Sequence, residues 1–242
     1  MVRAPGAISF STLRGDRGQR FMNDGHSPAT TPERAGSLDA LFDGYRRFRA
    51  EAWPELQRRF EQLAKGQSPK VMVIGCSDSR VDPQQILGAA PGQLFVLRNV
   101  AALVPPYAPD QAHHGASAAV EFAVRVLQVH RIVVLGHAGC GGVKALFQGA
   151  PAEASDFVVN WMGIAEEARA KVDPSLDWDA RERLAEQACA EVTVANLMTF
   201  PWVRERVEEG SLSISAMHFG VANGCLRCRD DARGVWCDVP TE

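Results

Sequence analysis

The chain has 242 residues, a formal net charge of -3 and a hydrophobic content of 46%. That length and apolar content suffice for one domain with a sizeable core. The charge balance predicts neither a nucleic-acid partner nor attraction to a membrane surface, and no apolar run approaches the roughly 20 residues that span a bilayer.

Residues 1–36 are rich in Gly, Pro, Ser, Thr and Arg, which predicts a disordered tail or linker. They lack the apolar stretch of a secretory signal, and a tail is favoured over a transit peptide. One domain is then expected over 37–242. A chain this long and apolar needs no disulfide framework, so its six cysteines are expected to bind metal or lie buried in a cytoplasmic protein.

A helical arm is predicted over about 37–66. Ser37 is a typical N-cap residue, and apolar residues recur beyond it at helical spacing. Pro54 is expected to break or restart this helix, and Gly66 to end it. The arm packs either on a partner subunit or on its own domain, and the sequence leaves both open.

Three short apolar runs predict buried strands: VMVIG at 71–75, LFVLR at 94–98 and IVVLG at 132–136. Helical spacing over 116–129 precedes the third run. A strand, a helix and a strand in this order form a parallel crossover unit.

The second half of the chain is predicted to be mainly helical. Helical patterns cover about 153–171 and 178–208, and the alternating segment 211–219 is typical of an edge strand. The expected fold class is therefore α/β: a mostly parallel central sheet flanked by helices, with an N-terminal helical arm and a C-terminal edge strand.

Reactive side chains follow two of the buried strands. VMVIG runs into Cys76, and IVVLG runs into His137 and then Cys140. Because ligands bind outside the carboxyl ends of parallel strands, these three side chains are expected to converge. Two thiolates and an imidazole suit zinc, and three protein ligands leave its fourth position open, as in catalytic sites. An open zinc lowers the pKa of bound water to about 7.

Taken alone, each of these residues is more often a buried core residue than a metal ligand. The combination favours a metal site, because all three follow buried strands within glycine-rich turns. Asp78 and Arg80 follow Cys76 in the segment CSDSR. The guanidinium would hold the carboxylate ionised, so that Asp78 could orient a water molecule at the metal or ligate the metal itself. An ordinary ion pair in a loop is the alternative interpretation.

These residues resemble the β-class carbonic anhydrases. The resemblance is carried by CSDSRVDPQQILGAAPGQLFVLRNVAALVPP, HGASAAVEFAV and IVVLGHAGCGGVKAL, with a weaker match in FPWVRERVEEGSL, and it covers roughly 38–220. It implies reversible hydration of carbon dioxide to bicarbonate by attack of zinc-bound hydroxide. It also implies one zinc per chain and a homodimer or dimer of dimers. The metal ligands it implies are Cys76, His137 and Cys140, with Asp78 and Arg80 governing the fourth position.

The sequence is most similar to the plant-type branch of this family, which implies an open zinc site with Asp78 paired to Arg80. Val73 stands where the bicarbonate-inhibited branch has Trp. The residues that the resemblance places around the substrate are Gln67, Phe95, Val100, Phe122 and Gly141. Two departures from the family, Ala138 in place of Ser or Thr and Phe122 in place of Tyr, remove hydroxyl groups from this pocket.

Alternative functions stay open. The same scaffold could hydrolyse carbon disulfide or carbonyl sulfide, or bind zinc without catalysis as a redox sensor. Cys225-x-x-Cys228, with Cys237 nearby, is a weak indication of a second metal or disulfide site. His113 and His114 could move protons, although a surface role is more usual for such residues.

Overall fold

The computed structural model describes residues 36–241. The predicted tail therefore lies almost entirely outside the described residues. The chain divides into two compact units, one up to Glu55 and one from Leu56 onward. No helix of the described residues is both long and apolar enough to cross a membrane.

The described part of the first unit is helical. Helix α1 (Leu38–Arg47) begins where the sequence predicts, since the Ser37 side chain accepts a hydrogen bond from the Ala40 N–H at 3.2 Å. A π-helical turn, Phe48–Ala52, then leads into α2 (Trp53–Leu63). Arg47, Phe48 and Trp53 all have right-handed helical dihedrals, so the helix continues through Pro54 and does not break or restart there as the sequence predicts. The π-helical turn just before the proline accommodates it.

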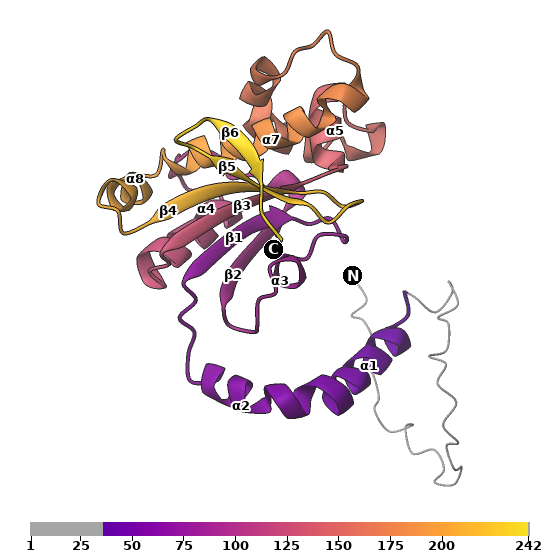
Figure 1. Ribbon diagram of the computed structural model, residues 1–242, viewed down its shortest axis with the longest axis vertical. Helices are drawn as coiled ribbons and strands as arrows, with labels where there is room; N and C mark the ends of the chain where they lie inside the picture. Colours follow the sequence, from indigo (N-terminus) through magenta and orange to yellow (C-terminus); the bar gives the residue numbers. More distant parts are fainter. Residues whose placement is uncertain (1–35, 242) are drawn as a thin grey trace, which may run out of the picture. The chain divides into compact units, whose positions relative to one another are not determined.

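The second unit is built around a six-stranded sheet of order β2-β1-β3-β4-β5-β6 (Figure 1). The strands are β1 (Val71–Cys76), β2 (Leu94–Asn99), β3 (Arg131–His137), β4 (Ser213–Phe219), β5 (Leu226–Asp230) and β6 (Val235–Asp238). The first four are parallel, and β5 and β6 add an antiparallel hairpin.

The position of β4 differs from the expectation. The segment 211–219 was predicted to form the edge of the sheet, but β4 pairs with β3 on one side and β5 on the other. The edge strand on this side of the sheet is instead β6, and β2 forms the other edge. The strands β5 and β6 are only five and four residues long, and β5 is rich in charged residues, so neither shows a strand pattern in the sequence.

Helices and short helical turns complete the unit. They are α3 (Pro83–Ile86), α4 (Gly115–Glu121) with a π-helical extension Phe122–Val126, α5 (Gly141–Gln148), α6 (Val158–Met162) with a 3-10 extension Gly163–Lys171, α7 (Trp178–Leu197) and α8 (Pro201–Glu208), and the 3-10 turns Val100–Ala102 and Ala152–Ala154. Helix α7 packs along β3 and β4 (Figure 1).

The central strands are buried on both faces, as their apolar runs predict. Met72 and Ile74 of β1 belong to one core cluster, and the intervening Val73 belongs to another. The parallel register pairs Gly75 with Leu135, so the two strands end side by side. The last residues of these strands, Cys76 and His137, are thereby brought to the same edge of the sheet.

Candidate metal centre

One group of side chains in the described part of the chain could hold a metal ion. The ligand atoms of Cys76, His137 and Cys140 all lie within 4.8 Å of one another, and the three residues are buried. Cys76 ends β1, His137 ends β3, and Cys140 immediately precedes α5. Gly139 has φ of 69°, a left-handed conformation that lets the short turn after β3 return Cys140 to the site.

The imidazole of His137 fits a metal ligand. Its Nδ1 lies 3.0 Å from the Ala138 carbonyl oxygen, so we assign the proton to Nδ1. Nε2 is buried and has no hydrogen-bond partner among the described residues. A buried, unpaired acceptor costs free energy unless a ligand occupies it, and ligating histidines commonly donate their other N–H to a carbonyl.

The two sulfur atoms also suit a metal. A hydrogen bond with Cys140 lowers the pKa of Cys76 to about 4 against the opposing effect of burial, and His137 adds to the shift. The same hydrogen bond, together with burial, raises the pKa of Cys140. Backbone groups of Gly142 and Val143 at the start of α5 oppose this rise. One thiolate is therefore already favoured, and this donor set of sulfur and nitrogen fits zinc.

Asp78 is held by Arg80 through two side-chain hydrogen bonds. Arg80 Nε donates to Asp78 Oδ1 at 2.9 Å, and Nη2 donates to Oδ2 at 2.7 Å. The backbone N–H of Arg80 also donates to Oδ1, at 2.9 Å. These bonds hold the pKa of Asp78 well below its ordinary value. Arg80 Nη2 further donates to the Gly139 carbonyl at 3.0 Å, which ties the pair to the turn before Cys140.

Arg98 on β2 fixes the loop that carries Asp78. Its Nε donates to the Cys76 carbonyl at 2.8 Å, and its Nη2 donates to the Asp78 carbonyl at 2.6 Å. Nη1 lies 3.5 Å from Asp82 Oδ2. Reasoning from the sequence missed this role. An arginine at the end of an otherwise apolar strand, beside a predicted site, was the available indication.

Glu186 is a second residue that the sequence did not reveal. Its Oε1 accepts a hydrogen bond from the backbone N–H of Cys140 at 3.1 Å, and its Oε2 lies 2.8 Å from Nε2 of His218 on β4. Both side chains are 2% exposed. The sequence places Glu186 within the predicted helix over 178–208 and gives it no role. The small residues Ala185, Ala188 and Cys189 around it were the indication that this part of α7 is buried.

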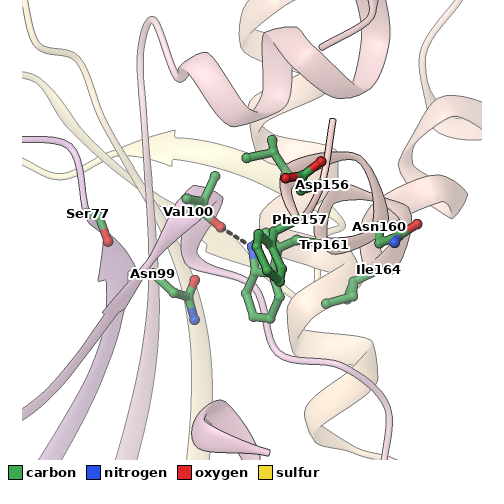
Figure 2. Close-up of a pocket in the computed structure, with 9 residues that line it drawn as sticks. Ser77, Asn99, Val100, Asp156, Phe157, Asn160, Trp161 and Ile164 are labelled. Atoms are coloured by element: carbon green, nitrogen blue, oxygen red, sulfur yellow. Dashed lines mark hydrogen bonds between the residues drawn. The ribbon is translucent and has the colours of Figure 1, made fainter. Parts of the chain in front are cut away.

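A largely apolar cavity of about 630 Å³ lies beside the metal centre (Figure 2). Its lining residues are Ser77, Asn99, Val100, Asp156, Phe157, Val158, Asn160, Trp161 and Ile164. Ser77 follows Cys76 directly, and Trp161 Nε1 donates to the Val100 carbonyl at 2.8 Å. Figure 2 shows the Trp161 indole turned toward Val100, opposite Ser77 and Asn99.

Val100 and Gly141, two of the residues predicted to lie around the substrate, are near the metal centre. Val100 lines the cavity just described, and Gly141 follows Cys140 at the start of α5.

Gln67, Phe95 and Phe122 are not brought to the metal centre within one chain. Phe95 pairs with Met72, four residues before Cys76, which is about 13 Å along the strand. The ring of Phe122 lies against Phe95 with centroids 5.9 Å apart, and Gln67 is exposed in the loop before β1. These three residues lie toward the opposite end of the sheet from the metal centre.

The two candidate proton carriers are also separate from the site. His114 Nε2 lies 2.7 Å from Asp110 Oδ1, and the pair lines another cavity with Tyr107. His113 is exposed. Neither histidine belongs to the group of Cys76, His137 and Cys140 or lines the cavity beside it.

Comparison with known proteins is consistent with this geometry. The model of a family described as carbonic anhydrase matches residues 71–226. Beta carbonic anhydrase 6, mitochondrial, of Arabidopsis thaliana is 38% identical over 195 residues, which cover 78% of this chain and 66% of that protein. The chain thus spans just under two thirds of that relative.

Solved structures are similar over most of the chain. The structure of the β-carbonic anhydrase CcaA has a TM-score of 0.79 and 30% identity, covering 85% of this chain and 93% of that one. One of two β-carbonic anhydrases of Sordaria macrospora, described as tetrameric, has a TM-score of 0.70 and 26% identity, covering 84% and 98%. A β-carbonic anhydrase of Coccomyxa in complex with acetazolamide has a TM-score of 0.68 and 27% identity, covering 79% and 86%.

Proposed function

Because the chain belongs to the β-class carbonic anhydrase family, we propose that it catalyses the reversible hydration of carbon dioxide to bicarbonate and a proton. The observation that carries this proposal is the buried group of Cys76, His137 and Cys140, in which His137 Nε2 has no partner among the described residues. A merely structural zinc would need a fourth protein ligand, and the described residues place none within this group.

We assign Cys76, His137 and Cys140 as the ligands of one zinc ion per chain. Zinc bound there would lower the pKa of a water molecule and supply hydroxide near neutral pH, as it does in the unrelated carbonic anhydrases that use three histidines. The backbone of Asp78 and of Ala101 forms hydrogen bonds to the Cys76 sulfur, and these lower the Cys76 pKa further. They would stabilise the thiolate that a metal requires.

Asp78 would orient the attacking hydroxyl group. Both of its oxygens accept hydrogen bonds from Arg80, so the carboxylate is fixed in position and stays ionised. A carboxylate in this state can accept a hydrogen bond from the nucleophile and keep its lone pair directed at the substrate. This pairing also supports a zinc site with an open fourth position, as in the plant-type branch. Asp78 forms hydrogen bonds with Arg80 and is not part of the group of Cys76, His137 and Cys140.

The apolar cavity beside Ser77 suits an uncharged substrate. Val100 and Trp161 supply apolar walls, and a dry wall strengthens the hydrogen bonds made inside the site. Carbon dioxide would approach from this side, with Gly141 at the start of α5 as a further lining position.

A second copy of the chain would complete the substrate pocket. Gln67, Phe95 and Phe122 lie away from the metal centre of their own chain, so they can line a pocket only at the metal centre of another subunit. There the Gln67 amide would donate a hydrogen bond to a substrate oxygen. This argument supports a homodimer or a dimer of dimers, and one similar structure is described as tetrameric. A cytoplasmic location stays a prediction.

The test is stopped-flow measurement of carbon dioxide hydration with a pH indicator, at pH 7 and pH 8.5, together with metal analysis. The Cys140→Ser variant is the control, because it removes one ligand and keeps the fold of the sheet. We expect about one zinc per chain, fast hydration at both pH values, and loss of hydration in the variant. Bound zinc without hydration at either pH would reject the proposal, and carbon disulfide turnover by the same sample would identify a hydrolase instead.

A further inference from the structure

Three cysteines lie outside the metal centre near the end of the chain. Cys225 precedes β5, Cys228 lies in β5, and Cys237 lies in β6. All three are free thiols. The only described group able to hold a metal is the one at Cys76, so these cysteines do not form the second metal site considered from the sequence.

The strand register pairs Cys228 with Cys237 rather than with Cys225. Cys228 and Cys237 are directly opposite each other in the antiparallel pair of β5 and β6. Opposite residues point to the same face of a sheet, whereas Cys225 lies before β5 and is opposite neither of the other two cysteines. The C-x-x-C spacing in the sequence therefore indicates the wrong partner.

The separation of the two backbones suits a disulfide. The Val239 N–H donates to the Leu226 carbonyl at 2.8 Å, which makes Leu226 and Val239 a hydrogen-bonded pair. Such pairs alternate along the ladder, so Cys228 and Cys237, two residues further along, are also one, with Cα atoms about 5.5 Å apart. Disulfides span Cα separations of about 4.4–6.8 Å.

Bond formation needs a small movement of the hairpin. In a hydrogen-bonded pair the Cβ atoms lie toward the wide end of the range of about 4.5–5.5 Å for opposite residues, whereas a disulfide holds them near 3.8 Å. The strand β6 can supply this movement, because it is the edge of the sheet and pairs only with β5. Cys237 is exposed and Cys228 is half-buried, so an oxidant in solution reaches Cys237 first.

We propose that Cys228 and Cys237 form a reversible disulfide when the protein meets a peroxide. The Cys237 sulfur attacks one peroxide oxygen, the O–O bond breaks, and one water leaves, which gives a sulfenic acid. The Cys228 sulfur then attacks the Cys237 sulfur. The S–S bond forms, the S–O bond breaks, and the hydroxyl leaves as a second water with the Cys228 proton. Two thiols lose two electrons in total, and one hydrogen peroxide is reduced to two waters.

The disulfide would lock a hairpin that is already attached to α7. Arg229 Nε and Trp236 Nε1 both donate to Glu191 Oε1, at 2.7 and 3.0 Å. These two residues are also opposite each other, on the other face of the hairpin from the cysteines. The disulfide therefore closes a short loop without disturbing the contacts to α7, and we expect oxidation to raise the thermal midpoint by about 5 °C.

Tryptic mapping distinguishes every possible pairing. The zinc-loaded full chain is treated with hydrogen peroxide, free thiols are alkylated, and the protein is digested without reduction. Cleavage after Arg227, Arg229 and Arg233 places Cys225, Cys228 and Cys237 in three separate peptides: 207–227, 228–229 and 234–242. We expect peptide 228–229 linked to peptide 234–242, and loss of this species after treatment with dithiothreitol.

Two variants complete the experiment. Cys237→Ser should abolish the linked species and the rise in thermal midpoint, while the matched control Cys225→Ser should keep both. Linkage of peptide 207–227 to either of the others, or three free thiols after peroxide treatment, would overturn the proposal. The mapping needs no turnover, so its outcome is independent of the proposed hydration activity.

Discussion

The Glu186 carboxylate accepts a hydrogen bond from the backbone N–H of Cys140 at 3.1 Å, although the two residues are 46 positions apart. The other oxygen of Glu186 faces Nε2 of the buried His218. This arrangement anchors the turn after β3 to both α7 and β4. Glu186 touches no reacting atom in this geometry, and its role is to position a metal ligand.

Replacing Glu186 should weaken zinc binding. Glu186→Ala leaves the Cys140 N–H and His218 without their hydrogen-bond partner in a buried site. The turn that carries Cys140 is then no longer held to α7. We expect zinc affinity to fall about 10- to 100-fold, the scale for losing a residue that supports a metal ligand. Competition with a chromophoric chelator measures this. The exposed Arg183→Ala on the same helix is the control, and equal affinity in the two variants would refute the positioning role.

Arg80→Lys should lower hydration activity while zinc content stays near that of the parent. A lysine cannot form the two parallel hydrogen bonds that Arg80 makes to Asp78, so the carboxylate is no longer fixed. We expect kcat to fall about 10-fold or more. Stopped-flow assays with metal analysis measure both quantities. Arg58→Lys, at an exposed position of α2, should change neither, and an unaltered kcat in Arg80→Lys would contradict the assigned role of the pair.

Two adjacent glycines at the start of α5 should respond oppositely to alanine. A Cβ on Gly142 would lie 2.7 Å from Val100 Cγ1 and 3.1 Å from Ala101 Cβ, so Gly142→Ala should reduce the free energy of unfolding by about 1–3 kcal/mol. A Cβ on Gly141 would have no neighbour within 4 Å. Urea unfolding should therefore show Gly141→Ala to be at least as stable as the parent, since alanine favours helix. An equal loss of unfolding free energy in both variants would show that close packing against Val100 does not cause the destabilisation of Gly142→Ala.

Two inactive variants should restore activity when they form mixed dimers. Cys140→Ser removes a zinc ligand, and Gln67→Ala removes the amide proposed to reach the metal centre of the other subunit. A mixed dimer then contains one intact site. The two variants are unfolded together in equal amounts and refolded, so about half of the dimers should be mixed. Each mixed dimer has one complete site out of two, so about a quarter of the parent activity should return. No recovery in a sample shown to contain mixed dimers would place Gln67 outside the shared pocket.

The stabilising contribution of Glu191 should be lost in acid. Burial would raise the pKa of Glu191, but hydrogen bonds from Arg229, Trp236 and Lys171 outweigh burial and hold the pKa below its ordinary value of 4.5. The folded state then binds fewer protons than the unfolded state. The stabilisation is present above pH 4.5 and is lost as the pH falls below it.

Glu191→Gln tests this dependence. The variant should be less stable than the parent in urea at pH 7, and the gap should narrow as the pH falls below 4.5. Comparing the two proteins cancels the acid sensitivity of the metal ligands, which both share. A gap that stays constant across this range would show that Glu191 does not titrate as described.

Much of the fold could be predicted because its strands are apolar on both faces. The runs that became β1, β2 and β3 were recognisable without any partner, and the N-cap Ser37 marked the start of α1. The hairpin of β5 and β6 could not be found in this way. Its strands are only five and four residues long and β5 is rich in charged residues, and it exists as sheet because β4 offers a free edge to pair with.

The sequence by itself determined which residues are the candidate metal ligands. Cys76 and His137 end apolar strands and Cys140 lies three residues beyond His137, and parallel strands end at a common edge whatever the rest of the chain does. Only the tertiary structure decided which residues support and complete that site. Glu186 reaches Cys140 through the packing of α7, Gln67 and Phe122 lie away from their own metal centre, and Cys228 faces Cys237 through strand register. Such relationships depend on long-range packing and pairing, which local spacing along the chain does not encode.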